Sequence, residues 1–138
     1  MKKMILLLFI LNADLAIATP VVQQNFSGVY DCQGNDAHEG NYKATATLEI
    51  EPKHSDTRAS SYHFSLEVPG FGLYRGHGIA EAEKMAIYFA LNQPNTQDYG
   101  TGIATFSKNA NGKYQFVKHY YEPQYEGGNH GSETCIQR

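Results

Sequence analysis

The sequence predicts an all-β protein, an eight-stranded antiparallel up-and-down β-barrel that follows an N-terminal signal peptide. Three observations predict this fold. Apolar and polar residues alternate with a period of two in several segments, turn-forming residues separate these segments, and no window after the first eighteen residues has sustained helical periodicity. Short strands joined by short turns favour a closed barrel, because closure removes the edges that an open sheet exposes.

The first eighteen residues have the features of a secretory signal peptide. Two lysines give a positive start, residues 4–11 form an apolar run, and residues 16–18, Ala-Ile-Ala, form a small-x-small cleavage site. The apolar run is shorter than the roughly 20 apolar residues that a membrane-spanning helix needs. We expect cleavage after Ala18, no membrane insertion, one barrel domain over 19–138, and a periplasmic or extracellular location. The alternative is a buried N-terminal helix.

Net charge argues against a nucleic-acid partner. The chain has a formal net charge of −3, and removal of residues 1–18, which carry two lysines and one aspartate, takes it to −4. A mildly acidic chain without a Lys/Arg cluster lacks the positive surface that phosphate backbones require. We therefore expect neither nucleic acid nor an anionic membrane surface as a partner.

The clearest strands lie at 41–51 and 61–68, where alternation is strict. The expected core-facing residues are Tyr42, Ala44, Ala46, Leu48 and Ile50 in the first segment, and Tyr62, Phe64, Leu66 and Val68 in the second. The residues between them are polar, which is the pattern of a strand with one face in the core and one in water. Pro69 and Gly70 then end the second strand.

The remaining strands follow from β-branched and aromatic residues between turn signals. In chain order they are expected at 26–33, 73–81, 85–91, 102–107, 113–122 and 132–137. Turn-forming residues occupy the connectors at 34–36, 92–98, 109–112 and 123–129.

The two cysteines are expected to form a disulfide. An even cysteine count in an exported chain favours a bridge over two free thiols. Cys32 lies in the first expected strand and Cys135 in the eighth, and barrel closure makes these strands neighbours. A bridge around about 100 residues stabilises by on the order of 4.7 kcal/mol in the chain-entropy model. The alternatives are a metal–thiolate pair or a catalytic cysteine, although the chain has no C-x-x-C spacing.

Three stretches carry a resemblance to known barrels. Residues 26–30, Phe-Ser-Gly-Val-Tyr, resemble the F-x-G-x-aromatic opening of lipocalin-like and avidin-like barrels, together called calycins. Residues 74–79 and 102–106 resemble stretches of small secreted barrels of Gram-negative bacteria. The resemblance implies a calycin-like fold and a ligand-binding function, but it does not indicate a particular ligand. Tyr30 stands where these families usually have Trp, and the chain has no Trp, so a biotin-type cage is not implied.

Arg75 and His77 are the most distinctive pair of candidate binding residues. They lie two residues apart on one face of the expected strand at 73–81. Pointing inward, they would anchor an anionic ligand in the barrel, with Glu122 as a partner for Arg75; pointing outward, they would be a solvated face. The candidate ligand-binding set is Tyr74, Arg75, His77, Tyr88, Tyr120 and Glu122.

Local metal and catalytic signatures are missing from the sequence. His119 and Glu122 are three residues apart on an expected strand, so they point to opposite faces and cannot share a metal. His38 and His54 lie in polar loops, where solvated histidines are ordinary. The chain has no nucleophile elbow, zinc-protease motif, P-loop or Rossmann glycines. We expect no metal and no cofactor, and we favour a non-catalytic protein while leaving enzyme activity open.

Three functions remain as hypotheses. The leading one is an exported, non-catalytic protein that binds a small apolar or amphiphilic molecule in the barrel. The second is a protein-binding module or enzyme inhibitor that acts through the loop from Tyr121 to His130. The third is a barrel-type isomerase or cyclase with His77 and a tyrosine as acid and base. An interior cavity would favour the first, a filled barrel with a projecting loop the second, and an inward His–Tyr pair the third.

Overall fold

A computed structural model describes residues 24–138. The signal peptide expected at residues 1–18 and its cleavage site lie outside these residues. The strands are β1 (Gly28–Asp36), β2 (Gly40–Ile50), β3 (Ser60–Val68), β4 (Gly72–Glu81), β5 (Lys84–Leu91), β6 (Tyr99–Lys108), β7 (Tyr114–Glu122) and β8 (Asn129–Gln137). Two single 3-10 turns, η1 (Pro52–His54) and η2 (Tyr125–Gly127), lie in the β2–β3 and β7–β8 connections.

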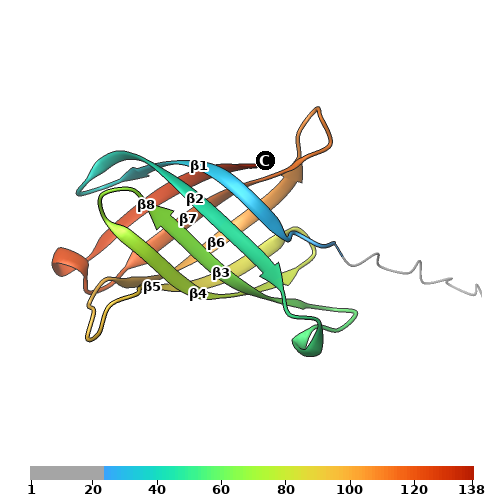
Figure 1. The fold of residues 1–138 in the computed structure, drawn as a ribbon, viewed down its shortest axis with the longest axis horizontal. Helices are drawn as coiled ribbons and strands as arrows, with labels where there is room; N and C mark the ends of the chain where they lie inside the picture. The colour runs from blue at the N-terminus through green and yellow to red at the C-terminus, as the bar shows by residue number, and fades with distance from the viewer. Residues whose placement is uncertain (1–23) are drawn as a thin grey trace, which may run out of the picture.

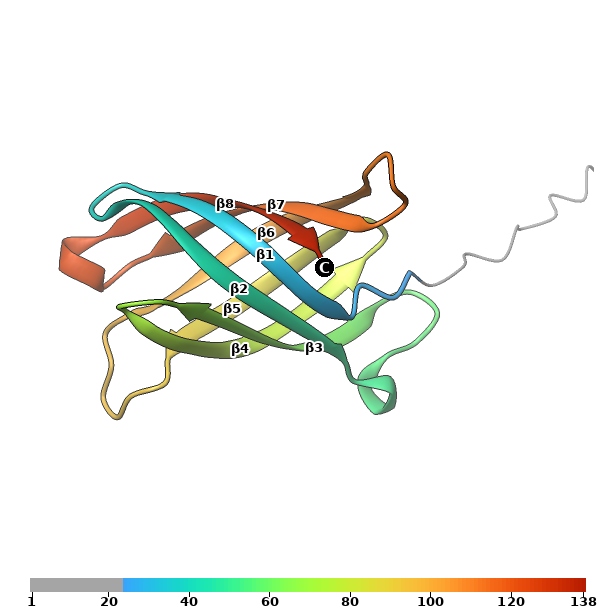
Figure 2. The same ribbon diagram turned by 45° about the horizontal axis from the view of Figure 1, so that its top comes forward.

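The eight strands form one closed antiparallel barrel in which every strand pairs with its neighbours in sequence (Figure 1). The ring is completed by β1 and β8, which lie side by side in both views (Figure 2). The predicted all-β up-and-down barrel is therefore confirmed, and the closed eight-stranded ring fits a calycin-like fold. Within residues 24–138, no helix is long and apolar enough to cross a membrane.

Alternation along each strand fills the barrel. In β2, Ala44, Ala46 and Leu48 are buried while the residues between them are more exposed. The same period of two runs through β3, where the predicted core residues Tyr62, Phe64, Leu66 and Val68 are all buried. Successive side chains of a strand point to opposite faces, so each strand contributes one row to the interior and one to the surface.

A disulfide joins the first strand to the last. Cys32 and Cys135 are direct cross-strand partners of β1 and β8, with their Cα atoms 4.0 Å apart. Both side chains are buried. The predicted bridge is confirmed, and it spans the seam where the barrel closes.

One expected turn lies inside a strand instead. Gly34 and Asn35 continue β1 as ladder partners of both β2 and β8, and the chain reverses only after Asp36. The Asp36 carboxylate accepts hydrogen bonds from the backbone N–H groups of His38 and Glu39, at 2.8 and 2.9 Å, which places the turn there. Turn propensity at residues 34–36 is overridden because both neighbouring strands extend far enough to pair with them.

One end of the barrel is closed by aromatic packing. Phe26, just before β1, is 1% exposed and stacks on Phe106 with ring centroids 4.0 Å apart. Its backbone carbonyl accepts a hydrogen bond from the Tyr30 hydroxyl at 2.7 Å, and its N–H donates to the Tyr62 hydroxyl at 3.1 Å. The chain entering the barrel thus seals this closed end.

The opposite end, which we call the mouth, is different in character. The β1–β2, β3–β4, β5–β6 and β7–β8 connections gather there, at the left in Figure 1. The interior beneath these four connections is lined by carboxylates and tyrosines as well as by apolar side chains. The mouth is therefore the part of the barrel interior where polar chemistry concentrates.

Candidate functional site

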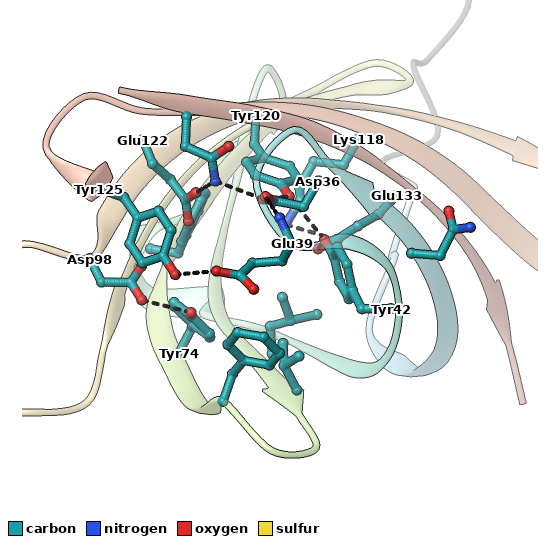
Figure 3. Close-up of a pocket in the computed structure, with 16 residues that line it drawn as sticks. Asp36, Glu39, Tyr42, Tyr74, Asp98, Lys118, Tyr120, Glu122, Tyr125 and Glu133 are labelled. Carbon is teal, nitrogen blue, oxygen red and sulfur yellow. Dashed lines mark hydrogen bonds and ion pairs between the residues drawn. The ribbon is translucent and has the colours of Figure 1, made fainter. Parts of the chain in front are cut away.

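A cavity of about 70 Å³ opens at the mouth of the barrel (Figure 3). Its lining comes from inward-facing strand residues and from the four connections above them. The lining residues are Asp36, Glu39, Asn41, Tyr42, Leu66, Val68, Phe71, Tyr74, Phe89, Asp98, Lys118, Tyr120, Glu122, Tyr125, Asn129 and Glu133.

An ion pair forms the floor of the cavity. Lys118 of β7 and Glu133 of β8 are ladder partners that both point inward, and Lys118 Nζ lies 2.9 Å from Glu133 Oε2. Both side chains are 1% exposed. The ammonium group also lies over the rings of Phe64, Phe89 and Tyr120, at 5.0, 4.9 and 5.3 Å from their centroids. A cation held this way is stabilised by one carboxylate and by the negative faces of the rings.

Tyrosine hydroxyls connect this ion pair to the carboxylates nearer the mouth. Tyr42 donates to Glu133 Oε1 at 2.6 Å, and the Tyr42 and Tyr120 hydroxyls lie 3.3 Å apart. Tyr120 donates to Asp36 Oδ2 at 2.7 Å. Glycines at positions 34 and 131 leave room for these two tyrosines. A Cβ at Gly34 would collide with the Tyr42 ring, and a Cβ at Gly131 would collide with the Tyr120 hydroxyl.

Asn129 bridges two carboxylates. Its side-chain amide donates to Asp36 Oδ2 and to Glu122 Oε2, each at 2.7 Å, while its Oδ1 is buried with no hydrogen-bond partner. Asn129 is 1% exposed, so its position at the start of β8 is set by packing as well as by these bonds. The arrangement holds two acidic groups close together at the wall of the cavity.

Asp98, from the β5–β6 connection, is the third acidic group in this region. It accepts a hydrogen bond from the Tyr74 hydroxyl at 2.8 Å through Oδ2, while Oδ1 is buried without a donor. Burial raises the pKa of Asp98, against the lowering effect of bonding to Tyr74 and to the Glu122 carboxyl. Two carboxyl groups can share a hydrogen bond only when one is protonated, so ionisation of both leaves Asp98 Oδ1 without a donor.

The carboxylates of the cavity divide by their pKa. Burial would raise the pKa of Asp36, but bonds donated by the Glu39 backbone, Tyr120 and Asn129 outweigh it, so the pKa falls below its usual range. Burial raises the pKa of Glu122 to about 7, assisted by the charges of Asp98 and Asp36. Asp36 is therefore a fixed anion at neutral pH, while Glu122 titrates there.

The segment from Tyr121 to His130, which carries the protein-binding hypothesis, is hydrogen-bonded to the β1–β2 turn at the mouth. Tyr125 in η2 donates to Glu39 Oε1 at 2.8 Å, and a ring nitrogen of His38 lies 3.1 Å from the Gly128 carbonyl oxygen. These contacts join the β7–β8 connection to the β1–β2 turn, as Figure 3 shows for Tyr125 and Glu39. Tyr125 contributes its ring to the cavity lining.

The structure separates the six residues of the candidate ligand-binding set into two groups. Tyr74, Tyr120 and Glu122 line the cavity. Arg75 and His77 are exposed on the outer face of β4, and Tyr88, 48% exposed, lies beside His77 on β5. The inward orientation considered for Arg75 and His77 is wrong, because the apolar and small residues Tyr74, Gly78 and Ala80 take the inward positions of β4. Arg75 therefore does not meet Glu122 in the barrel.

Several cavity residues were missed by sequence reasoning. Lys118 and Glu133 occupy inward positions of their strands, and the alternation that places Phe116 and Tyr120 inward also places Lys118 there. That alternation was the available signal for Lys118. Asp98 lies in the β5–β6 connection, and Asn129 starts β8 at a position that was expected to be a turn. No periodic pattern therefore pointed to either residue.

Metal ligands are not concentrated in the cavity. Among residues 24–138, one group of potential ligands near it contains Cys32, Cys135 and Glu133, but both sulfur atoms belong to the disulfide and cannot act as thiolates. The cavity itself offers carboxylate oxygens, tyrosine hydroxyls and one ammonium group. Its chemistry is that of hydrogen bonding and charge recognition.

Comparison with known proteins supports the fold. No protein-family model matches this sequence, and no curated protein matches it. The chain is similar in structure to a solved structure of EF1p2_mFAP2b bound to DFHBI, with a TM-score of 0.51, 11% sequence identity, and coverage of 82% of this chain and 94% of that one. At this level of identity the similarity concerns the barrel fold.

Proposed function

We propose that this protein is an exported, non-catalytic binding protein that takes the head group of a small amphiphilic molecule into the mouth cavity. We infer that the head group is a positively charged hydrogen-bond donor, such as a primary ammonium. Glu122, Asp98 and Asn129 bind the head group, while Tyr74 and Tyr120 flank it.

One observation carries the proposal: buried hydrogen-bond acceptors in the cavity lack donors. Asp98 Oδ1 and Asn129 Oδ1 are both buried without a hydrogen-bond partner, and an ionised carboxylate oxygen and an amide oxygen can only accept. Among residues 24–138, the other two buried side-chain atoms without a hydrogen bond, Lys118 Nζ and Glu133 Oε2, form an ion pair with each other. Buried polar atoms are nearly always hydrogen-bonded in folded proteins, so atoms left without a donor mark a place where a donor belongs. Both atoms belong to residues that line the cavity.

Charge in the cavity favours a cation. Its lining includes five carboxyl groups and one ammonium group, and that ammonium is already paired with Glu133. An anionic head group would meet carboxylates with no free cation to balance them, which is the opposite of the anion anchor considered for Arg75. Tyrosine and phenylalanine rings around the cavity add faces that attract cations.

Cavity size favours an amphiphile whose head alone is enclosed. A volume of about 70 Å³ is far below the roughly 300–1,000 Å³ of pockets that enclose drug-sized ligands. Leu66, Val68 and Phe71 line the side of the cavity at β3 and the turn after it, and Phe71 is 47% exposed. An alkyl chain lying along these side chains would bury apolar surface while its head group reached Asn129 and Asp98.

The alternatives receive less support. All six histidines of the chain are exposed, so the inward His–Tyr pair that would favour an isomerase is not formed by His77. The segment from Tyr121 to His130 is held against the β1–β2 turn, so it does not project as a free loop. Export is supported by the disulfide, since such bonds persist in oxidising compartments.

Calorimetric titration with three amphiphiles of equal chain length tests the proposal. Octylammonium, octyltrimethylammonium and octanesulfonate are compared at pH 8, below their micelle concentrations. We expect octylammonium to bind most tightly because it supplies both charge and N–H donors. Glu122→Gln should weaken octylammonium binding about tenfold or more, because a charge-assisted hydrogen bond becomes a neutral one.

Glu67→Gln is the matched control, since Glu67 is an exposed glutamate on the outer face of β3. It removes the same formal charge on the outside of the barrel wall, where Glu67 does not line the cavity, and should change the affinity less than twofold. Equal affinity for octanesulfonate, equal effects of the two substitutions, or no binding of any of the three amphiphiles would overturn the proposal.

A further inference from the structure

Two histidines and a glutamate meet on the outer wall of the barrel, away from the mouth cavity. His63 of β3 and His77 of β4 are direct cross-strand partners, and their ring centroids are 5.5 Å apart. Glu51, directly after β2, places Oε1 2.8 Å from His63 Nε2. One potential ligand atom from each of the three residues lies within 4.8 Å of the other two.

We propose that Glu51, His63 and His77 form a surface binding site for a divalent transition-metal ion of the zinc type. The site is independent of the function proposed for the mouth cavity, because it shares no residue with that cavity.

The ligand set selects the class of metal. Two imidazoles and one carboxylate suit Zn²⁺ and its neighbours Cu²⁺ and Ni²⁺, whereas Mg²⁺ and Ca²⁺ prefer oxygen ligands. Three protein ligands leave a coordination position for water. Zinc–ligand bonds of 2.0–2.2 Å in a tetrahedral site separate the ligand atoms by roughly 3.4 Å. Small side-chain rotations would bring atoms now within 4.8 Å to that spacing.

The barrel wall holds these ligands in place before a metal binds. The Glu51 N–H donates to the Ser61 carbonyl oxygen at 2.7 Å, which ties the end of β2 to β3. The backbones of His63 and His77 are fixed by the β3–β4 ladder. A site whose ligands sit on rigid strands loses little conformational entropy when it binds its metal.

Neighbouring groups favour a cation at the same place. His54 in η1 places Nδ1 3.8 Å from Glu51 Oε2 and is 71% exposed, so it is near enough to approach as a further ligand. Glu49 is the exposed ladder partner of His63 and adds a second carboxylate to this patch. His63 itself is 53% exposed, which leaves a path for a hydrated ion.

The site could not be recognised from sequence spacing because its ligands come from β3, from β4 and from the residue that follows β2. Residues 51, 63 and 77 have no short-range pattern, and only the antiparallel register brings them together. The outward orientation of His77, which removes it from the barrel interior, is what allows it to take part.

Titration of the disulfide-bonded protein with Zn²⁺ tests the proposal. The protein carries no affinity tag, and bound metal is first removed with a chelator. We expect one Zn²⁺ per chain. His63→Gln and His77→Gln should each weaken binding by tenfold or more, because each removes one of three ligands.

His119→Gln is the matched control, because His119 is an exposed histidine on the outer face of β7 outside the ligand group. It should change Zn²⁺ affinity less than twofold, and Glu122→Gln in the mouth cavity should leave it equally unchanged. Circular dichroism without metal checks that all variants keep the β-sheet spectrum. No binding of Zn²⁺ by the unsubstituted protein, or an equal loss in the His119 and His77 variants, would overturn the proposal.

Discussion

Lys118 determines how the charge of the mouth is distributed. The ammonium group is fully enclosed, and its one carboxylate partner is Glu133 at 2.9 Å. A buried ion pair of this kind contributes little net stability, because desolvation of both ions offsets their attraction. Since Lys118 is matched by Glu133, no further Lys, Arg or His among the residues that line the cavity balances the carboxylates nearer the mouth. This imbalance at the level of single residues is what makes the cavity selective for positive charge in our proposal.

Glu122 should make stability depend on pH. Its pKa is raised from 4.5 in the free side chain to about 7 by burial. The folded protein therefore holds a proton that the unfolded chain releases, and the free energy of unfolding falls as pH rises from about 4.5 to 7. In Glu122→Gln this contribution disappears, so the variant should be more stable than the unsubstituted protein at pH 8 by on the order of 2 kcal/mol.

Urea unfolding between pH 5 and pH 8 measures this effect. The difference between the two proteins should grow with pH across this window. Glu67→Gln, on the exposed face of β3, should leave the pH profile of the unsubstituted protein unchanged. A Glu122→Gln profile parallel to that of the unsubstituted protein would contradict the assignment of the titration to Glu122.

Alternation predicts which residues share a face, but it does not always say which face is inside. Tyr74, Tyr120 and Glu122 were expected in a binding set, and they line the cavity. Arg75 and His77 were expected to share a face and do so, on the outside. In β4 the inner face carries Tyr74 together with Gly76, Gly78 and Ala80, which have no side chain or a single methyl group, so hydrophobicity alone did not identify it as the inner face.

Strands were predicted better than their ends. Each of the eight expected segments overlaps one strand, but their ends differ: β1 spans Gly28–Asp36 instead of 26–33, and β8 begins at Asn129 rather than at residue 132. Glycine and asparagine at these ends have the local preferences of turns. Pairing with two neighbouring strands satisfies their backbone groups, and this non-local term is not visible in a window of sequence. The same extension carries Asp36 and Asn129 into the cavity wall.

Gly34 is required by the packing of β1 against β2. A Cβ at this position would collide with the ring of Tyr42, its direct ladder partner. Gly34→Ala should therefore lower the free energy of unfolding by about 1–3 kcal/mol, as overpacking of a filled interior does. The Tyr42 hydroxyl would also move away from Glu133, which it now contacts at 2.6 Å.

A double-mutant cycle with Tyr42→Ala isolates this collision. In the Tyr42→Ala background, Gly34→Ala should cost much less, because no ring remains for the new methyl group to meet. Chemical denaturation of the four proteins gives the coupling energy. Equal costs of Gly34→Ala in the two backgrounds would show that the ring is not the cause.

On the scale of the whole molecule, the sequence was sufficient to predict the fold class, but it was not sufficient to predict the class of ligand. Period-two alternation, turn spacing and the positions of the two cysteines all pointed to one closed barrel, because each reports on local pattern or on the ends of the chain. The cavity depends on how eight strands bring distant acids together, as when Asn129 bonds to Asp36 across 93 residues of chain. Such a grouping requires the register of every ladder between them.

The disulfide should contribute to the stability of the whole barrel, since it closes a loop with a sequence separation of 103 at the seam between β1 and β8. Loss of a native disulfide from a small secreted domain costs roughly 2–5 kcal/mol. The double variant Cys32→Ala, Cys135→Ala should accordingly melt several degrees to a few tens of degrees lower. Thermal unfolding with and without a reducing agent tests this: reduction should lower the Tm of the unsubstituted protein and leave that of the variant unchanged. An unsubstituted protein whose Tm is insensitive to full reduction would contradict the prediction.

The closed end has a practical consequence for handling the protein. Phe26 lies in that end, and the backbone N–H of the last residue, Arg138, donates to the carbonyl oxygen of Val29 at the start of β1. The entering chain and the final residue therefore leave the barrel together, on the side opposite the mouth (Figure 1). A linker added after Arg138 would attach the protein to a sensor chip or bead with every molecule oriented alike and its mouth directed toward the solution.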